Sequence, residues 1–253
     1  MVTSLEYSEG ELSEFLRGFL DSDSPFGKFM TKCWMIIGSN LFFVIISIPI
    51  VTIGAGFAGL YYTMFRTLRE NADGSLGPFK EFWKGFRMNF KQATIAWIAF
   101  LIIALVGVID YQICLKIGGI IGAFRFAILS IELIAVILFS YLIPVMTVFS
   151  DTLPHLIRNA FYFALHRPLK LIVILFFNIF PLFLTIIDVQ SRPLYAFCWC
   201  FFGFGSIAML GASLLYKDFL VFLPKDSEEG AEGSDMDWEK EAVQLDLRKL
   251  DGM

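Results

Sequence analysis

Residues 47–67, SIPIVTIGAGFAGLYYTMFRT, form the connection on which the arrangement of the chain depends. Pro49 and the glycines from Gly54 to Gly59 end a first apolar helix of about Thr31 to Ile50 and begin a second one of about Ala55 to Thr67. This second helix would be only about 20 Å long, whereas the hydrocarbon of a bilayer is roughly 30 Å thick. Three interpretations are therefore open for it: a tilted span, a span shielded by its neighbours, or a re-entrant helix.

Longer apolar runs follow this connection, and the composition indicates an integral membrane protein. Hydrophobic side chains make up 57% of the 253 residues and charged ones 17%, which is more apolar than a soluble domain requires. The sequence predicts an all-α polytopic membrane bundle of six transmembrane helices. The four further spans are expected at about Ala93–Val108, Ile121–Phe149, Leu171–Ile187 and Leu194–Tyr216.

The Lys and Arg residues predict the orientation of these spans. Fourteen of them fall in segments that six crossings would place beside the termini, whereas Lys116, Arg125 and Arg192 fall on the other side. Cytoplasmic loops of membrane proteins carry the excess of basic residues, so both termini are expected in the cytoplasm. Residues 1–30 are expected to form an amphipathic arm, 31–216 the membrane domain, and 217–253 an acidic, largely disordered tail. The first 30 residues are acidic and lack an apolar core followed by a cleavage site, so no cleaved signal peptide is expected.

Two patterns that suggest chemistry are rejected on their context. Gly54, Gly56 and Gly59 spell G-x-G-x-x-G, but an apolar helix rather than a strand precedes them, so close helix packing is predicted in place of nucleotide binding. The cysteines and histidines show no metal-ligand spacing. We therefore expect no cofactor, no metal, no nucleic-acid partner and no enzymatic activity. The residues concerned are Cys33, Cys114, Cys198, Cys200, His155 and His166.

Residues 77–93, GPFKEFWKGFRMNFKQA, carry the best-defined amphipathic pattern, with aromatic side chains on one arc and cations on the next. This basic aromatic segment is typical of a helix in the cytoplasmic headgroup layer, where anionic lipids attract the cations. The alternative is a docking face for a cytoplasmic partner. The candidate residues are Phe79, Lys80, Phe82, Trp83, Lys84, Phe86, Arg87, Phe90 and Lys91.

Polar residues within the apolar runs form a second candidate site, because a charge inside a membrane is costly. Arg125 and Glu132 lie seven residues apart on one helical face, so their side chains could pair. A structural role, either in such a pair or as a protonated Glu132, is one interpretation. The other is a small-solute transporter or channel that uses Glu132 and Asn178.

The stretch from residue 47 to residue 97 resembles the YesL family of bacterial integral membrane proteins, a domain of unknown function. The resemblance rests on PIVTIG at 49–54, on Tyr61 and Tyr62, and on FWKGFRMNFKQA at 82–93. Ala55 and Gly56 replace the Gly-Pro that is usual in the family, so a looser turn is expected.

The resemblance covers about the first 150 residues, and thereafter mainly YLIPVMTVFSDTLPHLIRNA at 141–160. It implies a protein of the bacterial cell membrane that is commonly encoded beside carbohydrate ABC importers. An accessory subunit is therefore the leading expectation, and its partners would be the lipid bilayer, ABC permease subunits and an ATPase. The resemblance carries over no catalytic residues.

Overall fold

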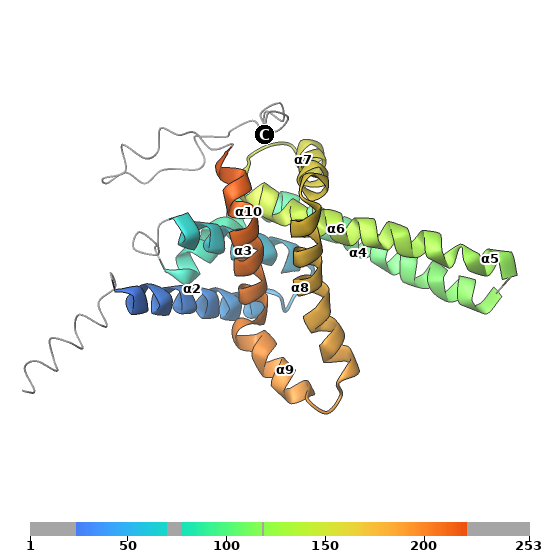
Figure 1. The fold of residues 1–253 in the computed structure, drawn as a ribbon, viewed down its shortest axis with the longest axis horizontal. Helices are drawn as coiled ribbons and strands as arrows, with labels where there is room; N and C mark the ends of the chain where they lie inside the picture. The colour runs from blue at the N-terminus through green and yellow to red at the C-terminus, as the bar shows by residue number, and fades with distance from the viewer. Residues whose placement is uncertain (1–23, 70–76, 118, 222–253) are drawn as a thin grey trace, which may run out of the picture.

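The structure, a computed structural model, describes residues 24–69, 77–117 and 119–221 (Figure 1). Within these ranges the chain forms helices and short connections and no strand, which confirms the all-α prediction for the described part. Most of the predicted N-terminal arm and the acidic tail beyond Val221 lie outside the described residues. The longer helices are α2 (Pro25–Ile46), α3 (Ile53–Arg69), α4 (Pro78–Ile117), α6 (Arg125–Val148), α7 (Leu153–His166), α8 (Pro168–Ile187) and α10 (Phe204–Leu220).

Short elements complete the chain. A 3₁₀ turn, η1 (Ile50–Thr52), leads into α3, and α5 (Gly119–Ala123) lies between α4 and α6. The helix α9 (Arg192–Cys198) continues into α10 through a π-helical stretch, η2 (Trp199–Gly203). The predicted fourth span, which was expected to begin at Ile121, therefore begins at Arg125.

Five helical units are long and apolar enough to cross a membrane, judged by length and composition: α2, α4, α6, α8 and the Arg192–Leu220 unit that includes α10. The predicted span at Ala55–Thr67 corresponds to α3, and it is not confirmed as a crossing. Of the 17 residues of α3, twelve are buried. The helix is thus enclosed by its neighbours, and it forms the centre of the fold.

The helices α2 and α3 pack beside the first half of α4. The rings of Trp34 and Phe79 lie 6.3 Å apart and Pro78 packs against Gly38, so at one end of this group α4 begins beside the middle of α2. At the other end, the Trp97 indole N–H donates to the Ile50 carbonyl at 2.7 Å. The connection between α2 and α3 therefore reaches only the middle of α4.

The helix α4 joins two parts that the sequence suggested would be separate. It is a single helix of 40 residues, about 60 Å long, whereas an interfacial helix and a span at Ala93–Val108 were expected. Its first half is packed against the core, but beyond Trp97 only Gly107 and Cys114 are buried. In Figure 1 this second half extends outward with α6, and its side chains are mainly exposed and apolar.

The G-x-G-x-x-G glycines lie where α3 meets its neighbours most closely. A Cβ on Gly54 would lie 2.5 Å from the Ala93 carbonyl oxygen, and one on Gly59 would lie 2.9 Å from the Phe82 carbonyl oxygen. Gly56 is equally close to a phenylalanine ring of α2. The prediction of close helix packing is confirmed, since a methyl group at these positions would push the helices apart.

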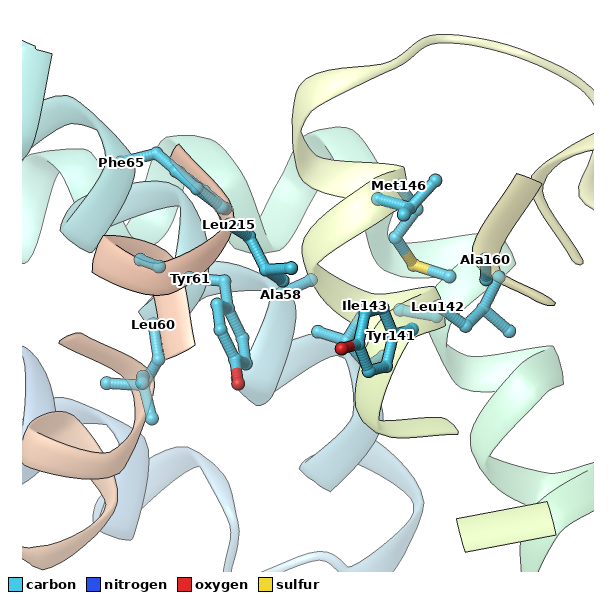
Figure 2. Close-up of a cluster of buried hydrophobic side chains, with 14 of the residues drawn as sticks. Ala58, Leu60, Tyr61, Phe65, Tyr141, Leu142, Ile143, Met146, Ala160 and Leu215 are labelled. Atoms are coloured by element: carbon cyan, nitrogen blue, oxygen red, sulfur yellow. The ribbon is translucent and has the colours of Figure 1, made fainter. Parts of the chain in front are cut away.

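Side chains from α3, α6, α7 and α10 meet in the hydrophobic core, which Figure 2 shows in close-up. Tyr141, Leu60 and Ala160 are fully buried in it. The core lies where the α4–α6 pair and the α8–α10 pair begin, and the two pairs extend from it in different directions (Figure 1). It therefore fixes the base of both pairs.

Candidate functional site

The basic aromatic segment lies on the first half of α4, and the structure divides it into a buried side and an outer side. Phe82 and Phe86 are 0% and 8% exposed and belong to the core. The remaining candidates lie on the outer side, which we call the basic aromatic face. It comprises Phe79, Lys80, Trp83, Lys84, Arg87, Phe90 and Lys91, of which Lys84 alone is only partly exposed.

Aromatic residues of α2 extend this face. The Phe42 ring contacts both Phe79, at 5.7 Å between centroids, and Trp83, at 6.2 Å. Trp34 packs edge-on against Phe79 and is 55% exposed. Sequence reasoning missed Trp34, because only the folding of α2 onto α4 brings it to the face. The available signal was a tryptophan near the start of an apolar run, a common interfacial position.

A buried ion pair lies between α3 and the buried side of the segment. Glu81 has a fully buried side chain, and its Oε2 lies 3.7 Å from Nε of Arg66. Two charges removed from water are stable only when they remain paired. The basic aromatic face is therefore held on a rigid helix by an electrostatic contact that the sequence did not reveal.

The intramembrane candidates Arg125 and Glu132 lie on the outer part of the α4–α6 pair and do not pair with each other. The guanidinium of Arg125 lies 4.9 Å from the centroid of the Phe126 ring. The Glu132 carboxylate lies against Gly107 of α4, whose missing side chain leaves room for it. Gly107 thus allows the carboxyl group to sit between two apolar helices.

Asn178 lies elsewhere, at a pocket of about 260 Å³ between the α4–α6 pair and the α8–α10 pair. Helix α3 also contributes to its wall. Because Glu132 is not among the lining residues, the structure does not bring Glu132 and Asn178 into one site. The aromatic part of the lining consists of Phe57, Tyr61, Phe100, Phe139, Trp199 and Phe204.

Asn40, also a polar residue in an apolar run, connects α2 to the π-helical stretch. Its amide nitrogen donates to the carbonyls of Trp199, at 3.0 Å, and Cys200, at 2.7 Å. Its amide oxygen accepts from the backbone N–H of Gly205 at 2.8 Å. A π-helical stretch changes the pairing of backbone groups, and Asn40 provides partners for three of them.

Charged residues also gather where α8 begins and α10 ends. Nζ of Lys170 lies 2.6 Å from the Asp218 carboxylate and also donates to the Leu214 carbonyl, while Arg167 lies 3.9 Å from Asp218. This cluster of charged residues holds the start of α8 against the end of α10. Among the described residues, no three His, Cys, Asp or Glu side chains are placed to hold a metal ion.

One comparison with known proteins gives a match. A family model described as a protein of unknown function, DUF624, matches residues 36–111, from the middle of α2 through most of α4. No curated protein and no solved structure matches the chain. Together with the apolar helices, the match supports a membrane protein of unknown function, and it covers α3 and the whole basic aromatic face.

Proposed function

We propose that this chain is a non-enzymatic accessory subunit of a carbohydrate ABC import system in the bacterial cell membrane. The sequence resemblance supports the association, and the basic aromatic face supports binding to a partner. In this proposal the face contacts a permease loop or the ATPase, while the exposed apolar helices lie in lipid and against permease spans.

The observation that carries the proposal is the position of the cations on α4 beside α2. The start of α4, at Pro78, packs against Gly38 in the middle of α2, and Lys80, Lys84, Arg87 and Lys91 follow along the next turns of α4. Placing a Lys or Arg in the centre of a bilayer costs about 2.5–3.5 kcal/mol. This face therefore requires water, anionic headgroups or an acidic protein surface, and a cytoplasmic partner provides the last of these.

Both termini are proposed to be cytoplasmic, with the basic aromatic face on the same side. The distribution of Lys and Arg supports this orientation. Crossings by α4, α6, α8 and the α9–α10 unit alone would return the chain to the side on which it started. The six crossings expected from the sequence would do the same, so either number is compatible with this orientation.

Copurification tests the accessory role. The full chain is extracted from native membranes in a mild detergent, and the recovered subunits are quantified by mass spectrometry. We expect ABC permease subunits at near-stoichiometric yield, and a strong loss in the K80E/R87E/K91E variant. The variant K116E/R125E/R192E makes the same change in net charge on the residues predicted to lie outside, and it should retain the permease. Recovery of no permease with the unaltered chain would refute the proposal.

An independent transporter is the second candidate function, and it is favoured by one observation: Asn178 lines a pocket among the apolar helices. In this alternative Glu132 would carry a proton during transport. Glu132→Gln should then abolish solute uptake by reconstituted vesicles, because glutamine cannot release a proton. Unchanged uptake in that variant would exclude the alternative.

A further inference from the structure

The pocket beside Asn178 is walled by apolar side chains and opens onto the apolar surface of α8. Ile179 and Leu182, which belong to its lining, are 45% and 48% exposed. No charged side chain is among the residues that line it. A ligand would therefore enter from the lipid and carry no charge where it is enclosed, since an unpaired charge in apolar surroundings is strongly disfavoured.

Two polar groups of the lining have no hydrogen-bond partner in the described part of the chain: the Tyr61 hydroxyl and the Asn178 amide. Tyr61 is only 6% exposed, and Figure 2 shows its hydroxyl pointing away from Phe65 and Leu215. The Asn178 side chain is half-buried. A polar group in apolar surroundings gains from a hydrogen-bond partner, so both groups favour a ligand that carries an acceptor.

The other polar side chains of the lining are already satisfied by the protein. The Ser140 hydroxyl donates to the Val136 carbonyl at 2.8 Å, and the Trp199 indole N–H donates to the Thr185 hydroxyl at 2.9 Å. Trp199 begins the π-helical stretch, an irregularity that is frequent at binding sites. Tyr61 and Asn178 thus provide the free donors, and the remaining wall provides apolar contact.

We propose that this pocket binds the acyl chain of a membrane lipid, with the ester carbonyl accepting hydrogen bonds from the Tyr61 hydroxyl and the Asn178 amide. An acyl chain matches the apolar wall, and a neutral ester matches two donors in a lining without charge. A bilayer supplies this ligand at high local concentration on the side where the pocket opens. The inference does not depend on the proposed accessory role, because no second protein takes part.

Photocrosslinking in a bilayer tests this inference. The full chain is reconstituted into phosphatidylcholine vesicles that contain a small fraction of phosphatidylcholine with a diazirine on one acyl chain. After irradiation, adducts are located by mass spectrometry of peptides. We expect adducts on the inner wall, on the α3 peptide with Phe57 and the α10 peptide with Ala208, which is only 2% exposed. Adducts confined to outward-facing residues such as Ile102 and Leu169 would overturn the proposal.

Matched variants separate binding in the pocket from general contact with lipid. Ser140→Leu fills part of the pocket and should lower the inner-wall adducts severalfold. Ser213→Leu is its control, because Ser213 also donates to the carbonyl four residues earlier but is exposed and does not line the pocket. Equal adduct yields in the two variants would contradict the assigned site.

Removing one donor tests the polar part of the site without changing its shape. Tyr61→Phe and Asn178→Leu should each lower the inner-wall adducts by about three- to tenfold, as expected for the loss of one hydrogen bond. Tyr141→Phe should leave them unchanged, because this tyrosine is fully buried and is not part of the lining. Tyr61→Phe keeps the ring, so the test remains decisive if Ser140→Leu fails to fold. An unchanged yield in both Tyr61→Phe and Asn178→Leu would refute the role of these donors.

Discussion

Asn40 and Asn178 are both amides in apolar helices, yet the structure gives them opposite surroundings. Asn40 is fully buried and makes three hydrogen bonds to the backbone around the π-helical stretch. Asn178 makes none with the described part of the chain. The sequence marks both residues as unusual, but only the folded arrangement shows which of them stabilises the protein.

We therefore expect Asn40→Leu to destabilise the protein by about 1–3 kcal/mol, because three backbone groups lose their partner. Asn178→Leu should have little effect on stability, or a small stabilising one, since it removes an unpaired amide from apolar surroundings. Denaturant titration of both variants in the same detergent measures the difference. Equal losses of stability would show that the contacts of Asn40 are not what stabilises η2.

Gly54 permits a close approach between α3 and α4. In Gly54→Ala the new methyl group would meet the Ala93 carbonyl, a backbone atom that can move only together with its helix. Alanine is the better helix former by about 0.5–1 kcal/mol, but overpacking typically costs about 1–3 kcal/mol, so we expect a net loss. Thermal unfolding followed by circular dichroism gives the sign. Gly122→Ala is the control, because the nearest atom to its Cβ is 3.2 Å away, and it should cause a smaller loss.

At the scale of elements, the pair Arg66–Glu81 joins α3 to α4 beneath the basic aromatic face. The Glu81 side chain is 1% exposed and that of Arg66 is 16% exposed. Glu81→Leu should destabilise the protein by about 3–5 kcal/mol, because it leaves a largely buried guanidinium without this carboxylate. The double variant R66L/E81L should recover much of that loss. Chemical denaturation of the two single variants and the double variant measures the coupling.

The exposed pair Asp151–His155 is the control for this cycle. It spans one helical turn, with N and O 3.1 Å apart, but His155 is 63% exposed. Its disruption by Asp151→Asn should therefore cost about 1 kcal/mol or less. If Glu81→Leu cost no more than this control, the buried pair would not hold α3 against α4.

The turn between α8 and α9 gives a prediction that depends on pH. Hydrogen bonds from Ser191, through its side chain and its backbone, hold the pKa of Asp188 below the ordinary value, and Tyr195 adds to the effect. A carboxylate with a lowered pKa stabilises the turn above the ordinary pKa, and the effect is lost as the pH falls through the folded-state value. Ser191→Ala should raise the pKa of Asp188, so that the turn loosens at a higher pH.

Carboxyl ¹³C NMR titration of the protein in micelles follows this group directly. Tyr195→Phe should give a smaller upward shift than Ser191→Ala, because Ser191 has the larger influence on the pKa. The opposite ranking would contradict the hydrogen-bond arrangement of this turn.

Helix α4 shows what could be predicted from the sequence at this scale. The amphipathic pattern of 77–93 and the apolar run that follows are both correct features of the chain. That the two form one continuous helix was not predicted. The composition changes from amphipathic to apolar near Ala93, and the same change is expected where an interfacial helix ends and a separate span begins. Two features depend on which helix packs against α4: the burial of Phe82 and Glu81, and the contact between Trp34 and Phe79. A periodic pattern does not identify that neighbouring helix.

The candidate sites also divide into features that the sequence predicts and features that depend on packing. The cations of α4 could be predicted as a surface, because lysine and arginine side chains are rarely buried. The pocket could not, because Phe57, Phe139 and Trp199 come from three separate parts of the chain. Asn178 was singled out as a polar residue in an apolar run. Tyr61 was noted for the family resemblance and not as a binding residue, since a tyrosine in a membrane helix is ordinary.

At the scale of the whole molecule, the α4–α6 pair and the α8–α10 pair leave the core in different directions (Figure 1). Both pairs expose apolar side chains along their length. A flat bilayer that both pairs cross would bring them closer to parallel and narrow the space between them. The pocket lined by Tyr61 and Asn178 lies at the base of that space, so a lipid chain bound there would also set how closely the two pairs approach.

The position of the α2–α3 connection along α4 bears on how many helices cross the membrane. This connection contacts α4 at Trp97, and the 20 residues from there to Ile117 are alone about 30 Å long, the thickness of the hydrocarbon. If the second half of α4 crosses the membrane, Ile50 lies on the side where that crossing begins. We therefore expect the α2–α3 connection to lie on the cytoplasmic side.

Labelling of single cysteines with an impermeant maleimide in intact cells tests this, in a chain whose four native cysteines are replaced by alanine. Lys116→Cys and Gln190→Cys should react, whereas Lys80→Cys and Val51→Cys should react only after permeabilisation. Val51 is 51% exposed at the connection, so its accessibility depends on the side and not on burial. Reaction of Val51→Cys in intact cells, with Lys80→Cys still protected, would instead establish that α2 and α3 cross as a pair. The cations of α4 would then lie at the depth of the hydrocarbon, and a partner that neutralises them would become a requirement of the fold.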